Sequence, residues 1–352
     1  MRSRNQTGRE STGELGLLRR IRARAGSGGA GLRLGIGDDC ALLKVRASEE
    51  LAVTTDLSIA GRHFRLDWHP PEVVGHRTLA RGLSDLAAMG ARPVAAFLSL
   101  GLPPELVQKE KARSAAAWGS TWVDRFYDGF LALAEAHKTP LAGGDLAESP
   151  VAVADVVLVG AVRRGRALLR SGARVGDLLY VTGKLGGAAA GLARLAMLAG
   201  ESKVSKASRP GGLRIPSGME AALQPHLYPQ PRIAQGLLLA QRRLATAGLD
   251  LSDGLSTDLN HLCEESGVAA EVDAAELPLY PGATLEQALN GGEDYELLFT
   301  AAPGTRIPRA IAGVPVTRIG RIVSRRVGRP PATLITQQGA QPLNPSGWEH
   351  FS

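Results

Sequence analysis

The stretch LDLSDGLSTDLNHLCEESG, residues 249–267, contains the change of periodicity that decides the fold class. Its leucines before Ser252 alternate with polar residues, as in a strand, and its leucines after Gly254 have helical spacing. The stretch therefore predicts a strand that leads directly into a helix. Asp250, Ser252 and Asp253 converge at the strand end, although in this fragment alone Ser252 or Asp253 is more typical of a helix N-cap.

The same alternation of strand and helix runs along the rest of the chain. Residues 51–57, 93–102 and 139–146 have the apolar content of strands. Residues 70–90, which begin with two prolines, and residues 120–138 have the spacing of helices. The sequence therefore predicts a mixed α/β (α+β) protein.

The length of 352 residues exceeds what one hydrophobic core usually serves, so we expect two domains. The apolar segment 151–162 is followed by a basic, turn-prone segment, 163–177, which is the best candidate for a junction. We expect an N-terminal domain over 13–162 and a C-terminal domain over 163–352. Residues 1–12 form an extension with no evident role.

Composition excludes several classes of protein. The net charge of +7 is spread along the chain and aromatic residues make up only 4%, so a nucleic-acid-binding platform is not predicted. The most apolar stretch is too short to span a bilayer, so no membrane segment is predicted. Two cysteines, Cys40 and Cys263, lack metal-site spacing; we expect packing residues in a protein of the reducing cytoplasm.

Aspartates recur where an apolar segment gives way to a turn. They occur in GIGDD (35–39), TTD (54–56), LSD (83–85), GGD (143–145) and DLSDG (250–254). Any one of these alone is typical of a solvated turn. Together, aspartates with Thr and Ser oxygens and without paired His or Cys suit Mg²⁺, which shares its coordination with substrate phosphates. The pattern therefore indicates metal-assisted phosphoryl transfer.

Two glycine-rich stretches do not match the common nucleotide-binding motifs. GSGGAG at 26–31 follows a basic helical stretch instead of a strand, so it fails as a dinucleotide-binding fingerprint. In TGKLGGAAAGL at 182–192 the lysine is misplaced for a Walker loop. A close turn between strand and helix is the better interpretation of the second stretch.

Eight motifs occur along the chain in a fixed order: GIGDDCALL, TTDLSIAGRHF, GLSDLAAMGARP, GGDL, LLRSGARVGDLLYVTG, LDLSDGLSTDL, GGEDYELLFT and GWEHF. In this order, over roughly residues 13–351, they resemble the motifs of the thiamine-monophosphate kinases. The broader superfamily, with aminoimidazole ribonucleotide synthetase, selenophosphate synthetase and a hydrogenase maturation protein, lacks the combination of GRHF, GGEDYELLFT and the aromatic C-terminal motif.

The resemblance implies a two-domain aminoimidazole ribonucleotide synthetase-like fold whose N-terminal domains pair in a homodimer. It implies ATP-dependent phosphorylation of thiamine monophosphate to thiamine diphosphate, by direct in-line transfer assisted by several Mg²⁺ ions. Because the acceptor phosphate is already anionic, no strong general base is needed. This agrees with the lack of an obvious base in the motifs.

The resemblance also implies roles for individual residues. Asp38 matches no ligand and is expected only to shape its turn. The implied Mg²⁺ ligands are Asp39, Thr54, Thr55, Asp56, Asp85, Asp145, Asp250 and Asp253. The implied ATP contacts are Gly144, Asp145, Arg170 and Ser252. The implied contacts to thiamine monophosphate are His63, Glu293 and Trp348.

Two positions depart from the family pattern: Gly82 stands where asparagine is common, and Tyr228 where arginine is common. Tyr228 puts in doubt an anion contact from its loop. Two alternative functions stay open at this point. One is a sibling ATP-dependent synthetase with another acceptor; for selenophosphate synthetase, Cys40 lies in the wrong context. The other is a non-catalytic nucleotide-binding protein.

Overall fold

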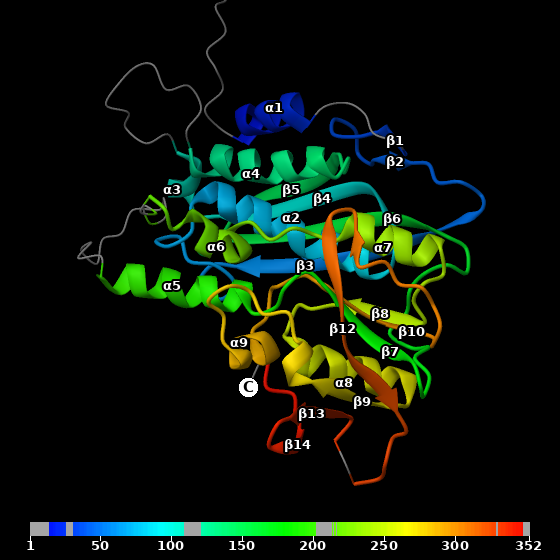
Figure 1. Ribbon diagram of the computed structural model, residues 1–352. Coiled ribbons are helices and arrows are strands. Elements are labelled where there is room, and N and C mark those ends of the chain that lie inside the picture. Colours follow the sequence, from blue (N-terminus) through cyan, green and yellow to red (C-terminus); the bar gives the residue numbers. More distant parts are fainter. Residues whose placement is uncertain are drawn as a thin grey trace, which may run out of the picture.

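The structure, a computed structural model, places the N-terminal half of the chain above the C-terminal half in the view of Figure 1. The predicted extension over residues 1–12 and Trp348 lie outside the described residues. The described residues are 14–25, 31–108, 121–201, 213, 215, 217–328 and 330–347.

The N-terminal half is built on a four-stranded sheet with the order β3-β6-β4-β5. Strands β4 and β5 are parallel, and the other neighbours are antiparallel. Strands β3 and β4 contain the strands predicted over 51–57 and 93–102, and β5 begins two residues later than the strand predicted over 139–146 and extends two residues beyond it. The strands are β3 (Glu49–Ile59), β4 (Arg92–Leu102), β5 (Leu141–Glu148) and β6 (Val153–Arg163). A separate pair is formed by β1 (Leu32–Leu34) and β2 (Leu42–Leu43).

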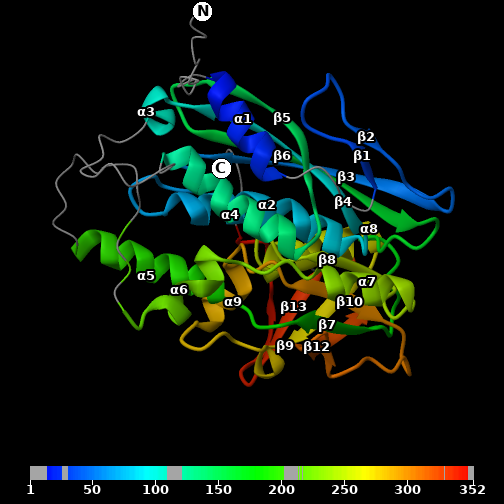
Figure 2. The same ribbon diagram turned by 90° about the horizontal axis from the view of Figure 1, so that it is seen from above.

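Helix α2 (Pro71–Ala88) packs against this sheet, and α4 (Trp122–Ala136) packs against α2 (Figure 2). Glycine makes the close approach of the two helices possible, because a Cβ on Gly75 would lie 1.9 Å from the Phe126 carbonyl oxygen. A Cβ on Gly129 would likewise lie 1.8 Å from the carbonyl oxygen of Glu72. Two further helices are α1 (Glu14–Ala25) and α3 (Pro104–Val107).

The C-terminal half is built on an eight-stranded, mostly antiparallel sheet with the order β14-β13-β9-β12-β7-β10-β8, and β11 pairs with β12. Its strands are β7 (Leu178–Thr182), β8 (Ala247–Asp250), β9 (Ala269–Asp273), β10 (Leu297–Ala301), β11 (Ala310–Ile311), β12 (Val314–Val323), β13 (Ala332–Thr336) and β14 (Gly339–Pro342). Its helices are α5 (Gly187–Glu201), α6 (Glu220–Leu227), α7 (Ile233–Gln241), α8 (Leu255–Ser266) and α9 (Leu285–Asn290), with a 3₁₀ turn η1 (Ala274–Glu276).

The strand and helix predicted over 249–267 are β8 and α8, and the helix ends at Gly267 in the left-handed conformation. The prediction that Ser252 or Asp253 caps α8 is wrong. The backbone N–H groups of Ser252, Asp253 and Gly254 all donate to one carboxylate oxygen of Asp258, each at 3.1 Å. Asp258 in the first turn of α8 thus satisfies the backbone N–H groups that an N-cap side chain would otherwise satisfy.

The two halves share a hydrophobic core. Phe299 of β10 and Leu239 of α7 are buried in the same apolar cluster as Leu79 of α2. Cys263 is buried in a second cluster inside the C-terminal half, as predicted, but Cys40 is exposed, so its assignment as a packing residue is wrong. None of the helices described here is long and apolar enough to cross a membrane.

Candidate active site

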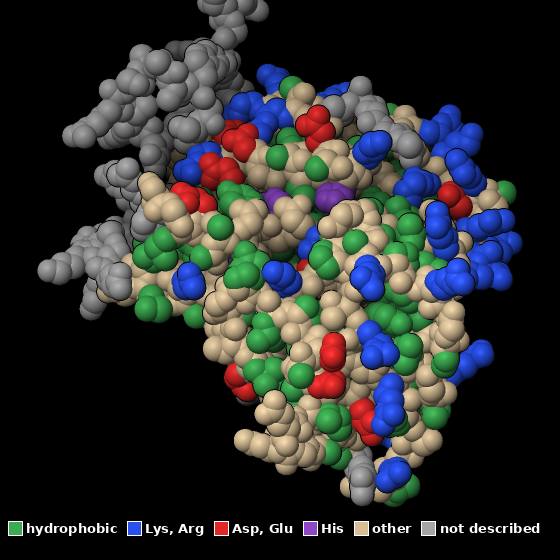
Figure 3. All heavy atoms as spheres, in the orientation of Figure 1, with side chains coloured by type: hydrophobic (Ala, Val, Ile, Leu, Met, Phe, Trp, Pro, Cys, Tyr) green, Lys and Arg blue, Asp and Glu red, His purple; other side chains and the backbone are tan. Residues whose placement is uncertain are grey.

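A pocket of about 750 Å³ lies between the two halves of the chain. Its walls come from the segment after β3, from α2, from the start of α5, from the β8–α8 turn and from the loop 290–295. Figure 3 shows a hollow at this level of the molecule, with histidine side chains (purple) beside it. Chain segments far apart in sequence therefore meet at one cavity.

Four aspartates that the sequence predicted as metal ligands line this pocket: Asp56 of β3, Asp85 of α2, Asp250 of β8 and Asp253 of the β8–α8 turn. Burial, and next the charge of Asp85, raise the pKa of Asp56 to about 6. Burial likewise raises the pKa of Asp85 and of Asp250. Thr54 donates a hydrogen bond to Asp85, and Ser84 donates one to Asp250 at 2.5 Å. The cluster thus has an excess of carboxylates that a cation would relieve.

The donor set fits Mg²⁺ by its chemistry, because it consists of carboxylate and hydroxyl oxygens. Ser252 and Asp253 of the β8–α8 turn line the same pocket. No three His, Cys, Asp or Glu side chains in the described ranges already stand at ligand distance from a common point. The pocket therefore offers oxygen ligands suited to Mg²⁺, but in the described residues they do not form a complete coordination sphere.

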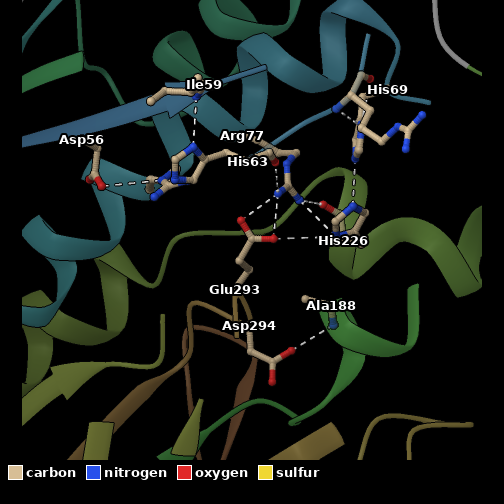
Figure 4. A network of polar contacts seen from close by, with 11 residues as sticks. Asp56, Ile59, His63, His69, Arg77, Ala188, His226, Glu293 and Asp294 are labelled. Atoms are coloured by element: carbon tan, nitrogen blue, oxygen red, sulfur yellow. Dashed lines mark hydrogen bonds and ion pairs between the residues drawn. The ribbon is translucent and has the colours of Figure 1, made fainter. Parts of the chain in front are cut away.

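Arg77 of α2 contacts two of the three predicted acceptor residues, His63 and Glu293, both of which line the pocket. Its Nη2 donates to both carboxylate oxygens of Glu293, at 2.8 and 2.7 Å, and to the carbonyl oxygen of His63 at 3.5 Å (Figure 4). Burial alone would raise the pKa of Glu293, but the positive charge of Arg77 holds it at about 2. Glu293 is therefore a fixed carboxylate.

Two buried histidines support Arg77 from behind. Nη1 of Arg77 donates to Nδ1 of His226 at 3.2 Å, so Nδ1 accepts and the ring proton is on Nε2. Nε2 of His226 then donates to Nε2 of His69 at 3.0 Å (Figure 4). Nδ1 of His69 lies 3.1 Å from the backbone nitrogen of Arg65 and 3.2 Å from its carbonyl oxygen. One proton between the two Nε2 atoms is what two neutral rings require.

The neutral state of these histidines predicts a pH dependence of stability. Burial lowers the pKa of His69 from 6.5 to about 4, and burial lowers that of His226 well below 6.5. The unfolded chain therefore binds more protons than the folded chain as pH falls from about 6.5 to 4. We expect the free energy of unfolding to fall over this window by up to about 1.4 kcal/mol per pH unit for each histidine.

The measurement is urea unfolding between pH 7.5 and 4.5, compared with the double variant His69→Gln/His226→Asn. The comparison is needed because the raised pKa values of Asp56, Asp85 and Asp250 act on stability in the opposite direction. The variant should lose less stability than the parent as pH falls. Parallel pH profiles would contradict the neutral assignment.

The loop that carries Glu293 is held in a strained conformation. Glu293 and Tyr295 both have positive φ values, 67° and 50°, which side chains rarely adopt. Asp294 between them accepts a hydrogen bond from the backbone N–H of Ala188 at 3.0 Å (Figure 4). It accepts another from the backbone N–H of Gly186 at 2.6 Å. The loop is thereby tied to the start of α5, which forms another wall of the pocket.

Two family models match most of the chain. Residues 37–162 match the N-terminal domain of AIR synthase related proteins, and residues 174–330 match the C-terminal domain. The thiamine-monophosphate kinase of Escherichia coli (strain K12) is 37% identical over 352 residues, covering 97% of this chain and 98% of that protein. The chain belongs to the thiamine-monophosphate kinase family.

Solved structures agree with this membership. The thiamine-monophosphate kinase of Stenotrophomonas maltophilia K279a has a TM-score of 0.74 at 38% identity, covering 90% of this chain and 95% of that one. AaThiL complexed with AMPPCP and TMP has a TM-score of 0.71 at 33% identity, covering 96% and 97%. The hydrogenase maturation protein HypE in complex with ATP, at 18% identity and a TM-score of 0.60, shares the fold.

Some residues that the family resemblance nominated lie away from the main pocket. Asp39, Gly144 and Asp145 line a second pocket of about 460 Å³ beside α1. Thr55 is exposed on the face of the sheet opposite to Thr54, and it donates to Asp155 at 3.3 Å. The structure therefore divides the nominated metal ligands between two places.

Gly144 has a structural reason to be glycine in this family member. Its φ is +149°, and a Cβ there would lie 1.8 Å from the carbonyl oxygen of Leu98 on the parallel strand β4. Arg170 is exposed, and its charge lowers the pKa of Asp85, although burial of Asp85 outweighs this effect. Arg170 is thus close enough to influence the acidic cluster.

The C-terminal segment reaches the main pocket as far as the structure describes it. Ser346 and Gly347 line the pocket, and the N–H of Gly347 donates to Thr257 Oγ1 at 3.1 Å. A Cβ on Gly347 would lie 1.9 Å from the carbonyl oxygen of Asp253. The segment that leads to Trp348 therefore packs tightly on the β8–α8 turn.

Tyr228, the departure from the family pattern, contributes packing. Its ring stands edge-on to that of His76, with centroids 5.2 Å apart. Arg232 in the same loop is paired with the buried Glu296, at 2.5 Å between Nη2 and Oε1. The side chains of Tyr228 and Arg232 therefore both contact other residues of the same chain.

Sequence reasoning missed the residues that organise this site. Four residues make hydrogen bonds that position a predicted site residue or its loop, and none of them was itself predicted to act in the site. They are Arg77, His226, Asp258 and Asp294. Two signals were available: Asp294 sits inside GGEDYELLFT, and Asp258 sits inside LDLSDGLSTDL. The partners of Arg77 are 149 and 216 positions away in the chain, which no local pattern records.

Proposed function

We propose that this chain phosphorylates thiamine monophosphate to thiamine diphosphate with ATP, by direct in-line transfer. One observation carries the proposal: a single pocket is lined by Asp56, Asp85 and Asp250 and also by His63 and Glu293. Acids suited to a metal-bound phosphate chain thus face residues suited to a cationic acceptor. Relatives named thiamine-monophosphate kinase cover nearly the whole chain, which supports the same reaction.

The acceptor end is proposed to be formed by Glu293 and His63. Glu293, kept ionised by Arg77, would complement the positive charge of the thiazolium ring. Nδ1 of His63 accepts the N–H of Ile59 at 3.0 Å, so a neutral ring carries its proton on Nε2. That N–H is a donor suited to an oxygen of the acceptor phosphate.

Mg²⁺ would be held by Asp56, Asp85, Asp250 and Asp253. Thr54, also a predicted ligand, donates a hydrogen bond to Asp85. When bound, the metal ion neutralises charge on the nucleotide phosphates. Asp39, Thr55 and Asp145 stay predicted ligands, and Gly144, Asp145, Arg170 and Ser252 stay predicted ATP contacts. The role of the protein is to place two polyanions in line within one pocket.

A homodimer that pairs N-terminal domains is part of the proposal. The face of the N-terminal sheet opposite to α2 exposes Leu51, Val53 and Leu57, which are 55%, 61% and 46% exposed. An apolar sheet face of this kind commonly marks an interface between proteins. Light scattering tests the dimer, and Val53→Glu should shift it to monomer. The cytoplasm stays the predicted compartment.

The test of the reaction is ADP formation from ATP and Mg²⁺ with thiamine monophosphate, compared with free thiamine and aminoimidazole precursors. We expect ADP only with thiamine monophosphate, in step with thiamine diphosphate. Turnover with an aminoimidazole precursor instead would favour the sibling synthetase. Binding of ATP without turnover of any acceptor would favour the non-catalytic alternative.

Trp348 gives a further prediction for the acceptor end. If its ring stacks on the thiazolium, Trp348→Ala should weaken thiamine monophosphate binding by about 0.5–2 kcal/mol and leave ATP binding unchanged. Trp348→Phe should recover part of the loss. Calorimetric titration of both ligands checks this, and equal loss of both together with a large drop in melting temperature would contradict the contact.

A further inference from the structure

Arg81 of α2 stands among the acids of the pocket, although no motif nominated it. Its Nε lies 3.6 Å from Oδ1 of Asp56, and its side chain is 19% exposed. It lines the pocket one helical turn before Asp85. An arginine is therefore built into a cluster whose other groups suit a metal ion.

The contact with Asp56 does not satisfy the guanidinium. A separation of 3.6 Å is too long for a hydrogen bond. Nε of Arg81 is buried and makes no hydrogen bond to any part of the chain that the structure describes. Buried polar groups almost always have a partner, so an unpaired donor in a pocket points to an absent ligand.

Arg81 lines the same pocket as residues of both ends of the site. Asp56, Asp85 and Asp250 of the nucleotide end and Glu293 of the acceptor end share this cavity with it. Burial disfavours the charged guanidinium, but the carboxylates of Asp56 and Glu293 favour it, and the pKa of Arg81 is raised. The arginine therefore stands in the cavity in which a phosphoryl group passes from the nucleotide to the acceptor.

The residue next to Arg81 in the chain, Gly82, has no side chain that could contact Asp56. Gly82 is buried, and a Cβ there would lie 2.6 Å from Leu158 Cδ1 and 3.7 Å from Asp56 Oδ2. Gly82 therefore presents no polar group to Asp56, whereas Arg81 presents a planar set of N–H donors. Such a set matches the oxygens of a phosphate.

We propose that Arg81 binds the terminal phosphate of the nucleotide, the group that is transferred. The inference rests on the proposed function for the identity of the reaction. Asp56 is the ion partner of Arg81 and also a proposed Mg²⁺ ligand. A metal ion on Asp56 would therefore release the guanidinium toward the phosphate.

The experiment compares binding of AMPPCP and of ADP, each with Mg²⁺, to the parent, Arg81→Met and Arg81→Lys. Arg81→Met should weaken AMPPCP about tenfold, the effect of one lost charge-assisted hydrogen bond, and leave ADP unchanged. Arg81→Lys should recover part of the loss, because it keeps the charge without the planar donors. Arg321→Met, at a side chain that is 66% exposed and paired with Glu271, is the control.

Equal weakening of both nucleotides, or of neither, would overturn the proposal, since only a contact to the terminal phosphate separates them. Melting temperatures show whether Arg81→Met still folds, and Arg81→Lys repeats the test if it does not. Turnover of thiamine monophosphate by the parent is measured in parallel. If the parent fails to turn it over while the difference between AMPPCP and ADP persists, the acceptor is wrong and the role of Arg81 stands.

Discussion

Asp85→Asn is expected to lower kcat by about 10²–10³-fold while leaving the fold intact. The change removes one charge at nearly constant volume. Asp85 lines the pocket together with Asp56 and Asp250, and it accepts a hydrogen bond from Thr54. Mg²⁺ held by carboxylates loses affinity when one becomes an amide. The kinetic loss should therefore be accompanied by a weaker response to Mg²⁺.

Stability separates this effect from damage to the fold. Burial raises the pKa of Asp85, so the carboxylate is unfavourable when no cation is bound. In the absence of Mg²⁺ the variant should melt at or above the temperature of the parent, and added Mg²⁺ should stabilise it less. Glu105→Gln, at an exposed carboxylate on α3, is the control. Parent-like kcat at saturating Mg²⁺ would refute the assignment of Asp85.

The second large effect is expected at Arg77. Arg77→Met should lower the free energy of unfolding by about 3 kcal/mol, because it leaves a largely buried carboxylate without its partner. The side chains of Arg77 and Glu293 are only 6% and 27% exposed. The same change should raise KM for thiamine monophosphate more than KM for ATP, since Glu293 and the His63 backbone lose their common support.

A double-variant cycle tests this explanation. Glu293→Gln removes the stranded charge, so Arg77→Met/Glu293→Gln should be more stable than Arg77→Met alone. Arg125→Met is the matched control, because Arg125 pairs with Glu72 at 2.6 Å on a more exposed surface. It should cost less than about 1 kcal/mol. Additive losses in the cycle would show that Arg77 and Glu293 do not act as a pair.

The sequence predicted the fold class and the main elements because the relevant signals are local. The strand and helix of residues 249–267 follow from alternation and helical spacing within one stretch, and Gly267 ends the helix as expected. The two-domain fold followed from motifs resembling a known family, and the family models match residues 37–162 and 174–330. The limits proposed for the two domains remain a prediction.

Local signals also misled where two explanations of one residue competed. Ser252 and Asp253 have the side chains of an N-cap, but Asp258 satisfies the backbone N–H groups of the turn from within α8. Cys40, treated as a packing residue, is exposed beside Asp39. In both cases the environment of the residue, which sequence pattern does not contain, decided its role.

The sequence by itself determined the chemistry that this site can perform, because carboxylate and hydroxyl oxygens are properties of residue types. Only the tertiary structure decided which of these groups share a pocket, and it joined Asp56, Asp85 and Asp250 but placed Asp39 and Asp145 in another. It alone brought Arg77 to Glu293 and Arg81 to Asp56. The physical reason is that the charge state and direction of a buried side chain depend on partners distant in the chain.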